Sequence, residues 1–246
     1  MPQGNNIALA LLIDGDNAEA KLLPQILAEV SKYGTAIIRR VYGDWEQTQM
    51  KSWKEVLHTH ALKPVQQFRY TTGKNATDIA LVIDAMDILH TSEVGGFCIV
   101  SSDSDYTRLA IRIREQNLFV LGIGRRLTPS PFVSACNVFV YTENLKQNDS
   151  ASPDGTAEDA SLKRSGKKHK QMISLFDRAF DIAVQDSGWA HLGAMGNALH
   201  QIDPGFDPRT YGHKQLSQLM EAHPDIFDVR KSGPNKTVYY IRMKTN

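Results

Sequence analysis

Cysteine is scarce in this sequence, with only two among 246 residues. Cys98 and Cys136 lie in apolar contexts and match no zinc-site or disulfide spacing, which argues against a disulfide-stapled or zinc-binding scaffold. A reduced, cytoplasmic setting is therefore expected. No apolar run approaches the length of a membrane-spanning helix, and the first residues lack the basic region of a signal peptide, so we expect no membrane partner.

The chain also lacks a strong net charge. Lys and Arg number 28 against 27 Asp and Glu, a formal net charge of +1, so bulk electrostatics does not point to a polyanionic partner. The hydrophobic share of 41% and the charged share of 22% are typical of a globular protein. The length allows one large domain or two modest ones.

One polar segment divides the chain. Residues 146–166 contain a single large apolar residue, Leu162, which predicts a flexible linker. In residues 1–145 apolar strands alternate with helical patterns, and this predicts a three-layer α/β/α domain with a mostly parallel sheet. The expected strands are residues 7–13, 35–42, 62–68, 97–100, 118–123 and 138–141.

The region after the linker has a different pattern. Residues 167–246 hold three expected helices followed by a β hairpin, which predicts a small winged-helix-like domain. The second and third helices are expected at residues 191–200 and 211–223, and the hairpin strands at residues 226–229 and 238–243.

Acidic residues follow two expected strands and begin one helix. Asp14 ends the first strand, Asp103 and Asp105 follow the strand of residues 97–100, and Asp78 begins a helix. Ligands bind beyond the carboxyl ends of the strands in open α/β sheets, so we expect these four side chains to meet at one edge. Carboxylates that converge without basic partners repel one another unless a hard divalent metal binds them. The pattern therefore predicts a site for Mg²⁺ or Mn²⁺, which would serve either a nucleic acid or a small phosphate ester.

Helix capping is the alternative explanation for these acids. The pairs Asp16 with Glu19, Asn75 with Asp78, and Ser102 with Asp105 have the three-residue spacing of a capping box. Asp14 and Asp103 fit no such pair, and an unpaired carboxylate is costly at the end of a buried strand. These two residues therefore favour the metal site.

Four stretches carry a resemblance to a known family. They are residues 13–17 (IDGDN), 42–45 (YGDW), 74–78 (KNATD) with Asp84, and 102–106 (SDSDY). In this order they resemble the NYN domain, a LabA-like family among the PIN-like nucleases, over about residues 5–145. The resemblance implies a PIN-like fold and metal-dependent hydrolysis of RNA phosphodiester bonds by an endoribonuclease.

The same resemblance implies roles for individual residues. Asp14, Asp78, Asp103 and Asp105 would be the catalytic, metal-binding carboxylates. Asn17 would orient the first carboxylate or the substrate, and Lys74 would meet a phosphate. Asp84 follows Asp78 by six residues and so does not share its helical face, which makes Asp84 a supporting residue rather than a ligand.

Other residues of this region are expected along a single-stranded RNA path. Arg39 and Trp45 place charge and an aromatic ring near one strand end. Ser102 and Arg125, at two other strand ends, would contact substrate. The alternatives are a core position for Trp45 and a solvated loop for Arg125.

The C-terminal region carries a second resemblance. Residues 188–193 (GWAHLG), 204–216 (PGFDPRTYGHKQL) and 238–241 (VYYI) resemble the OST-HTH or LOTUS domain, over about residues 165–246. This implies an RNA-binding or protein-docking module. The side chains expected to contact phosphates are Lys167, Lys168, Lys170, Arg209, His213, Lys214, Arg230, Lys231 and Lys236. Scattered solubilising charge is the alternative.

Three other functions stay open for the chain. The first is a catalytically weak RNA-binding adaptor that keeps the acidic pocket. The second is a phosphohydrolase of the haloacid dehalogenase type, suggested by the sequence Asp14-Gly15-Asp16, although Ala18 stands where that family has Thr or Val. The third, a DNA-binding regulator, leaves the acidic residues unexplained. No histidine falls within the acidic motifs, which argues against a metal-independent ribonuclease.

Overall fold

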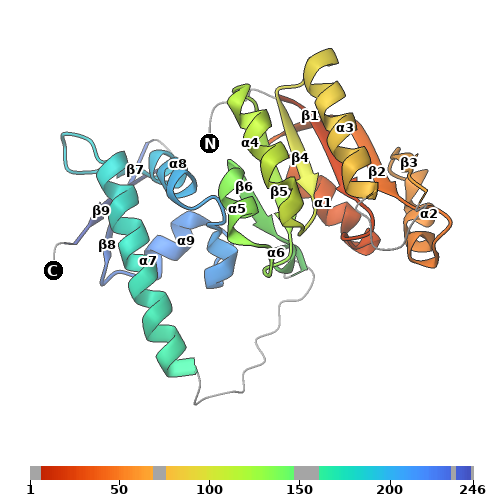
Figure 1. Cartoon of the computed structure of the whole chain (residues 1–246). Coiled ribbons are helices and arrows are strands. Elements are labelled where there is room, and N and C mark those ends of the chain that lie inside the picture. The colour runs from red at the N-terminus through yellow and green to blue at the C-terminus, as the bar shows by residue number, and fades with distance from the viewer. Residues whose placement is uncertain (1–6, 69–75, 147–160, 234–236, 245–246) are drawn as a thin grey trace. The chain divides into compact units, whose positions relative to one another are not determined.

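The computed structural model describes residues 7–68, 76–146, 161–233 and 237–244, and for residues 161–171 it describes the backbone alone. The chain divides into two compact units, one within residues 4–149 and the other within residues 150–246 (Figure 1). Among the described helices, none combines the length and the apolar character that crossing a membrane requires.

The N-terminal unit is built on a sheet of six strands, and every neighbouring pair is parallel. The strand order is β3-β2-β1-β4-β5-β6. The chain runs outward from β1 through β2 to β3, and then returns to the other side of β1 to form β4. The strands are β1 (Ile7–Asp14), β2 (Gly34–Gly43), β3 (Lys63–Gln66), β4 (Gly96–Val100), β5 (Phe119–Gly124) and β6 (Val138–Tyr141).

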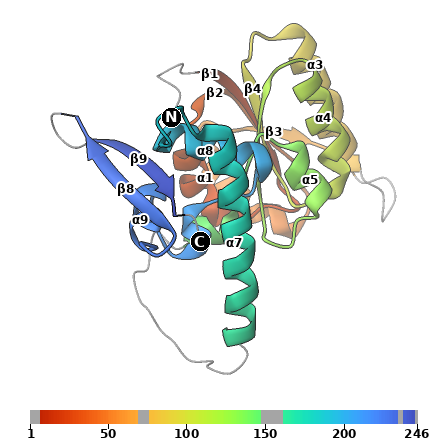
Figure 2. The same cartoon turned by 90° about the vertical axis from the view of Figure 1, so that its left-hand side faces the viewer.

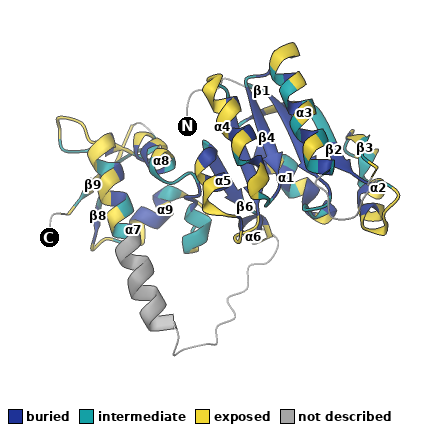
Figure 3. Ribbon diagram, in the orientation of Figure 1, coloured by how far each residue is buried: buried dark blue, intermediate teal, exposed yellow. Residues whose placement is uncertain are grey.

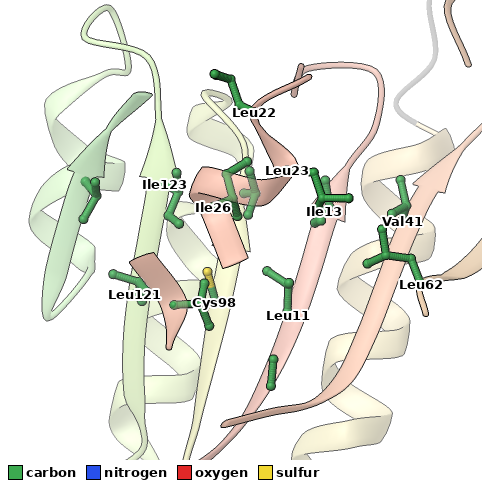
Figure 4. Close-up of a cluster of buried hydrophobic side chains, with 14 of the residues drawn as sticks. Leu11, Ile13, Leu22, Leu23, Ile26, Val41, Leu62, Cys98, Leu121 and Ile123 are labelled. Atoms are coloured by element: carbon green, nitrogen blue, oxygen red, sulfur yellow. The ribbon is translucent and has the colours of Figure 1, made fainter. Parts of the chain in front are cut away.

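Strand β1 lies inside the sheet and contributes side chains to two hydrophobic cores, because alternate side chains of a strand point to opposite faces of the sheet. Leu11 and Ile13 pack on one side with helices α1 (Leu23–Val30), α2 (Lys51–Leu57) and α6 (Thr142–Lys146). Ala10 and Leu12 pack on the other side with α3 (Ala76–Thr91), α4 (Thr107–Glu115) and α5 (Ser130–Ala135). Figure 4 shows side chains of the first of these two cores, Leu11 and Ile13 among them. The sheet is thus buried between two helical layers (Figure 3), and the predicted three-layer α/β fold is confirmed.

The C-terminal unit packs three helices against a small antiparallel sheet of order β7-β9-β8 (Figure 2). Its core contains Phe176, Met195, Leu199, Phe206 and Ile241. The elements are α7 (Ser161–Ala183), β7 (Ala190–His191), α8 (Leu192–Ile202), α9 (Leu216–Glu221), β8 (Phe227–Ser232) and β9 (Val238–Met243).

The structure corrects two sequence-based expectations in this unit. Helix α7 begins at Ser161, so residues 161–166 of the predicted linker are helical, while residues 147–160 lie outside the described part of the chain. The helix expected at residues 211–223 is interrupted: a 3-10 turn ends at Tyr211, and α9 begins only at Leu216. Gly212 has a φ of 82°, a left-handed conformation that stops the turn from continuing as a helix.

Candidate functional site

Asp14 ends β1 and lies at the centre of a buried hydrogen-bond cluster, with 0% of its surface exposed. Its Oδ1 accepts from the backbone N–H groups of Asp16 (3.1 Å) and Asn17 (3.3 Å). Its Oδ2 accepts from Asn17 Nδ2 (2.6 Å), Ser101 Oγ (3.0 Å) and Tyr106 OH (3.3 Å). Asp14 therefore caps the turn that follows β1, although it fits no capping-box pair in the sequence.

The end of β4 supplies the adjoining side chains, because Ile13 of β1 lies opposite Val100 of β4. Ser101 follows β4; its hydroxyl donates to Asp14 and accepts from the N–H of Asp103 (3.1 Å). Asp103 in turn caps a 3-10 turn, since its Oδ1 accepts from the N–H of Asp105 (2.9 Å). Asp103 thus caps this turn through a contact with a spacing of two, although it fits no capping-box pair in the sequence.

Tyr106 connects the strand ends to α3. Its hydroxyl donates to Asp78 Oδ1 (2.6 Å) and lies 3.3 Å from Asp14 Oδ2. The ring is fully buried and packs against Phe132, with the ring centroids 6.3 Å apart. No role for Tyr106 is expected from the sequence alone, although a residue with both a ring and a hydroxyl directly after paired acids is a usable signal.

Asp16 is a further acid of the cluster, which the sequence indicated as a possible helix cap and as the second acid of the Asp14-Gly15-Asp16 pattern. It accepts hydrogen bonds from Thr77 Oγ1 of α3 (3.0 Å) and Gln49 Nε2 (2.9 Å). The loop after β1 is thereby tied both to α3 and to the segment that precedes α2.

Burial and mutual repulsion both act on these carboxylates. The pKa of Asp14 is raised, chiefly by burial and further by the charges of Asp78 and Asp16, while the hydrogen bonds from Asn17 and Ser101 oppose the rise. The pKa of Asp78 is raised by burial first, and then by the charges of Asp103, Asp105 and Asp16, against the hydrogen bond from Tyr106. The five acids are thus near enough for their charges to interact.

The chemistry of this donor set fits Mg²⁺ or Mn²⁺, because every candidate ligand is an oxygen. Within the described residues, however, no three acidic, histidine or cysteine side chains are already arranged to enclose an ion. The expected cage of four carboxylates is therefore not preformed. Mg²⁺ commonly binds one or two carboxylates together with water and substrate phosphates, and an open cluster of this kind can supply those ligands.

The location of the cluster agrees with the strand order. The order reverses between β1 and β4, and in open α/β sheets the ligand crevice lies at such a switch point. Beside the cluster is a small pocket of about 40 Å³, whose polar lining includes Asn17, Ser101, Ser102, Arg125 and Thr142.

The residues expected along the RNA path are only partly brought to this edge. Ser102 and Arg125 lie together there, since the N–H of Arg125 donates to Ser102 Oγ (2.9 Å), and the side chain of Arg125 is exposed. Trp45 is half-buried after β2, and its Nε1 donates to the carbonyl of Val65 (3.0 Å). Lys74 lies outside the described residues.

Arg39 is not brought to the cluster. Its Nε donates to the carbonyl of Ala36 (3.0 Å) and its NH1 to that of His60 (3.3 Å). It precedes Tyr42, the residue opposite Asp14, by three positions on β2, which places its backbone about 10 Å from the site edge. The structure thus gives Arg39 a role in joining β2 to the end of α2.

Asp84 faces β2 from α3. Its carboxylate pairs with Arg40 and accepts a hydrogen bond from Tyr42 OH. These contacts join the helix that carries Asp78 to strand β2.

In the C-terminal unit, the structure pairs one expected phosphate ligand with an acid. Arg209 NH2 lies 2.7 Å from Asp207 Oδ2, with 13% of the arginine side chain exposed. Its charge is thus compensated within the fold, which removes the basis for the predicted phosphate contact. Lys214 is exposed and His213 half-buried just before α9, and the side chains of Lys167 and Lys168 lie outside the described residues.

Comparison with known proteins identifies both parts of the chain. Residues 8–144 match the family model of the NYN domain, and residues 163–239 match that of the OST-HTH/LOTUS domain, so both resemblances are confirmed in the predicted order. No curated protein matches the chain.

Two solved structures are similar to parts of the chain. One is the crystal structure of a protein of unknown function from Vibrio parahaemolyticus, 18% identical, covering 57% of this chain and 96% of its own, with a TM-score of 0.47. The other is the solution NMR structure of an uncharacterized protein from Nitrosomonas europaea, 30% identical, covering 39% of this chain and 90% of its own, with a TM-score of 0.28.

Proposed function

The chain belongs to the NYN domain family, part of the PIN-like nuclease superfamily, and from this membership and the site we propose that it is a metal-dependent endoribonuclease. An OST-HTH/LOTUS domain follows, and this domain indicates RNA binding. The observation that carries the proposal is the cluster joining Asp14, Ser101, Tyr106 and Asp78 where the strand order switches.

The acids have different parts in this proposal. Asp78 and Asp103 each accept one hydrogen bond within the described residues, so they have oxygens left to hold Mg²⁺ or Mn²⁺. Asp105 is exposed beside them, and Asp14 lies buried behind them. When bound, the ion would activate a water and neutralise charge on the scissile phosphate.

Other residues would orient the RNA. Arg125 is exposed next to Ser102 and is placed to meet a phosphate that flanks the cleaved bond. Asn17 holds Asp14 through its side-chain amide, which supports the expected orienting role. Lys74 is proposed to contact a phosphate on the strength of the family resemblance alone.

A second candidate is an RNA-binding adaptor with little activity. It is favoured by the five hydrogen bonds that already occupy Asp14 and by the lack of a preformed cage among the described residues. The same bonds disfavour the phosphohydrolase alternative, because a nucleophilic aspartate needs a reachable oxygen and Asp14 is fully buried.

The deciding experiment incubates the full chain with end-labelled single-stranded RNA in Mn²⁺, Mg²⁺ or EDTA. We expect internal cleavage with either metal, and loss of cleavage in EDTA and in Asp103→Asn. Asp87→Asn, an exposed acid at the far end of α3, is the matched control and should cleave normally. Equal decay in EDTA or in Asp103→Asn would reject the nuclease; RNA binding without cleavage at any Mn²⁺ concentration would support the adaptor.

A further inference from the structure

The C-terminal sheet has one face that its helices do not cover. Phe227, Val229, Ile241 and Met243 point into the core shared with α7, α8 and α9. Because strand side chains alternate, the residues between them point to the opposite face.

That opposite face carries rings and basic groups in register. His191 of β7 pairs with Tyr240 of β9, which pairs with Arg230 of β8, so the three side chains cross the sheet in one row. The rings of His191 and Tyr240 meet edge to face, with their centroids 5.6 Å apart. Next to this row, the guanidinium of Arg242 lies 5.0 Å from the ring centroid of Trp189.

These side chains are accessible. His191, Arg230 and Arg242 are exposed, and Tyr240 and Trp189 are half-buried. The imidazole of His191 has a fixed orientation, because its Nδ1 accepts from the N–H of Gly193 (3.1 Å), which leaves Nε2 to carry the proton and to act as a donor.

The charge of this face is positive. Asp228, the acid in the adjacent row, is paired with Arg242 (2.7 Å) and Lys244 (3.4 Å), and the hydrogen bond from Arg242 lowers its pKa. Arg230 makes no ion pair within the described part of the chain. This face thus carries one acidic side chain, Asp228, and three basic ones, Arg230, Arg242 and Lys244.

We propose that this face, defined by Trp189, His191, Arg230, Tyr240 and Arg242, binds single-stranded RNA by stacking bases on its rings. Aromatic rings interleaved with cations bind single strands, because every unpaired base has a flat face and every nucleotide has a phosphate. In a duplex the base faces are hidden in the stack. The proposal rests on the proposed action on RNA, and it assigns the RNA contact to the sheet in addition to the residues around α9.

The test measures fluorescence anisotropy of a short labelled single-stranded RNA with the full chain in EDTA, so that binding is measured apart from cleavage. Tyr240→Ala should weaken binding by roughly fivefold to a hundredfold, the range found when one stacking ring is removed. Tyr240→Phe keeps the ring and should bind nearly as well as the native protein. Tyr239→Ala is the matched control, because Tyr239 lies next in the strand, points to the other face and sits beside Lys231.

Further arms separate stacking from charge and from misfolding. Arg230→Gln should lower the slope of log affinity against log salt by about 0.7, the value for one lost contact to a single strand. A duplex of the same sequence should bind more weakly than the single strand. Each variant should unfold at nearly the native temperature. Three outcomes would overturn the proposal: native affinity in Tyr240→Ala, an equal loss of affinity in Tyr239→Ala, or preference for the duplex. A failed cleavage assay would not affect this test, because binding is measured in EDTA.

Discussion

Replacing Tyr106 by Phe removes one hydroxyl from the centre of the candidate site and leaves a ring of the same shape. That hydroxyl donates to Asp78 at 2.6 Å and lies 3.3 Å from Asp14. The ring is fully buried, so the variant keeps its packing against Phe132. The change therefore removes only the polar contacts of that hydroxyl, which join the turn after β4 to Asp78 of α3 and to Asp14 of β1.

The expected loss of stability is about 1.5 kcal/mol, the lower end of the range for a hydrogen bond to a charged group, because Asp78 is only half-buried and water can replace the hydroxyl. Tyr42→Phe is the matched control. Tyr42 is also fully buried, and its hydroxyl also donates to a carboxylate of α3, that of Asp84. Urea unfolding should show a similar loss in both variants.

Cleavage should distinguish the two variants. The hydrogen bond from Tyr106 lowers the pKa of Asp78 against the effect of burial, so its removal raises that pKa further. The proposed metal site needs the ionised carboxylate, and the acidic limb of the pH–rate profile should then move to higher pH. An unshifted limb in Tyr106→Phe, or an equal shift in Tyr42→Phe, would refute the reasoning.

Three further predictions concern stability. Gly122→Ala should cost roughly 1–3 kcal/mol in urea unfolding, because a Cβ there would come within 2.4 Å of the Phe139 ring, and soluble expression at native yield with native stability would contradict this. Arg209→Met should destabilise the C-terminal unit by about 3 kcal/mol in thermal unfolding, because it removes the guanidinium that pairs with the buried carboxylate of Asp207. An unchanged unfolding transition would show that the ion pair of Arg209 with Asp207 contributes nothing to stability. The pKa of Asp14 is raised in the folded state, so the folded state binds the proton of Asp14 more tightly than the unfolded state does. The native protein should therefore gain stability relative to Asp14→Asn as the pH falls through the raised pKa toward 3.8. A difference in unfolding free energy between the two proteins that stays constant with pH would contradict this prediction.

The layers and the strands could be predicted because they depend on local patterns. β1 and β4 are buried on both faces and read as continuous apolar runs, and the acids after them were visible at the strand ends. The family motifs then located the same acids. All of this information lies within short windows of the sequence.

The partners of those acids could not be predicted, because they depend on which strands are neighbours. Ser101 and Tyr106 meet Asp14 across 87 and 92 residues, and only the return of the chain to the far side of β1 brings them there. The capping role of Asp103 was missed because its Oδ1 accepts from the N–H two residues ahead, whereas the capping box has a spacing of three. Asp14 accepts from the N–H groups two and three residues ahead, but Asn17 stands where a capping box has Glu or Gln. The break at Gly212 and the pairing of Arg209 with Asp207 arise from a 3-10 turn that helical periodicity does not detect.

The central position of β1 has a consequence for how the protein is made. β1 contributes Asp14, but two of the groups that hold Asp14 in place, the hydroxyls of Ser101 and Tyr106, follow β4, far along the chain. An N-terminal fragment that stops before β4 has the first acid without the scaffold that positions it. If this cluster carries the proposed cleavage of RNA, its set of acids is complete only after the chain has been synthesised through the turn that follows β4.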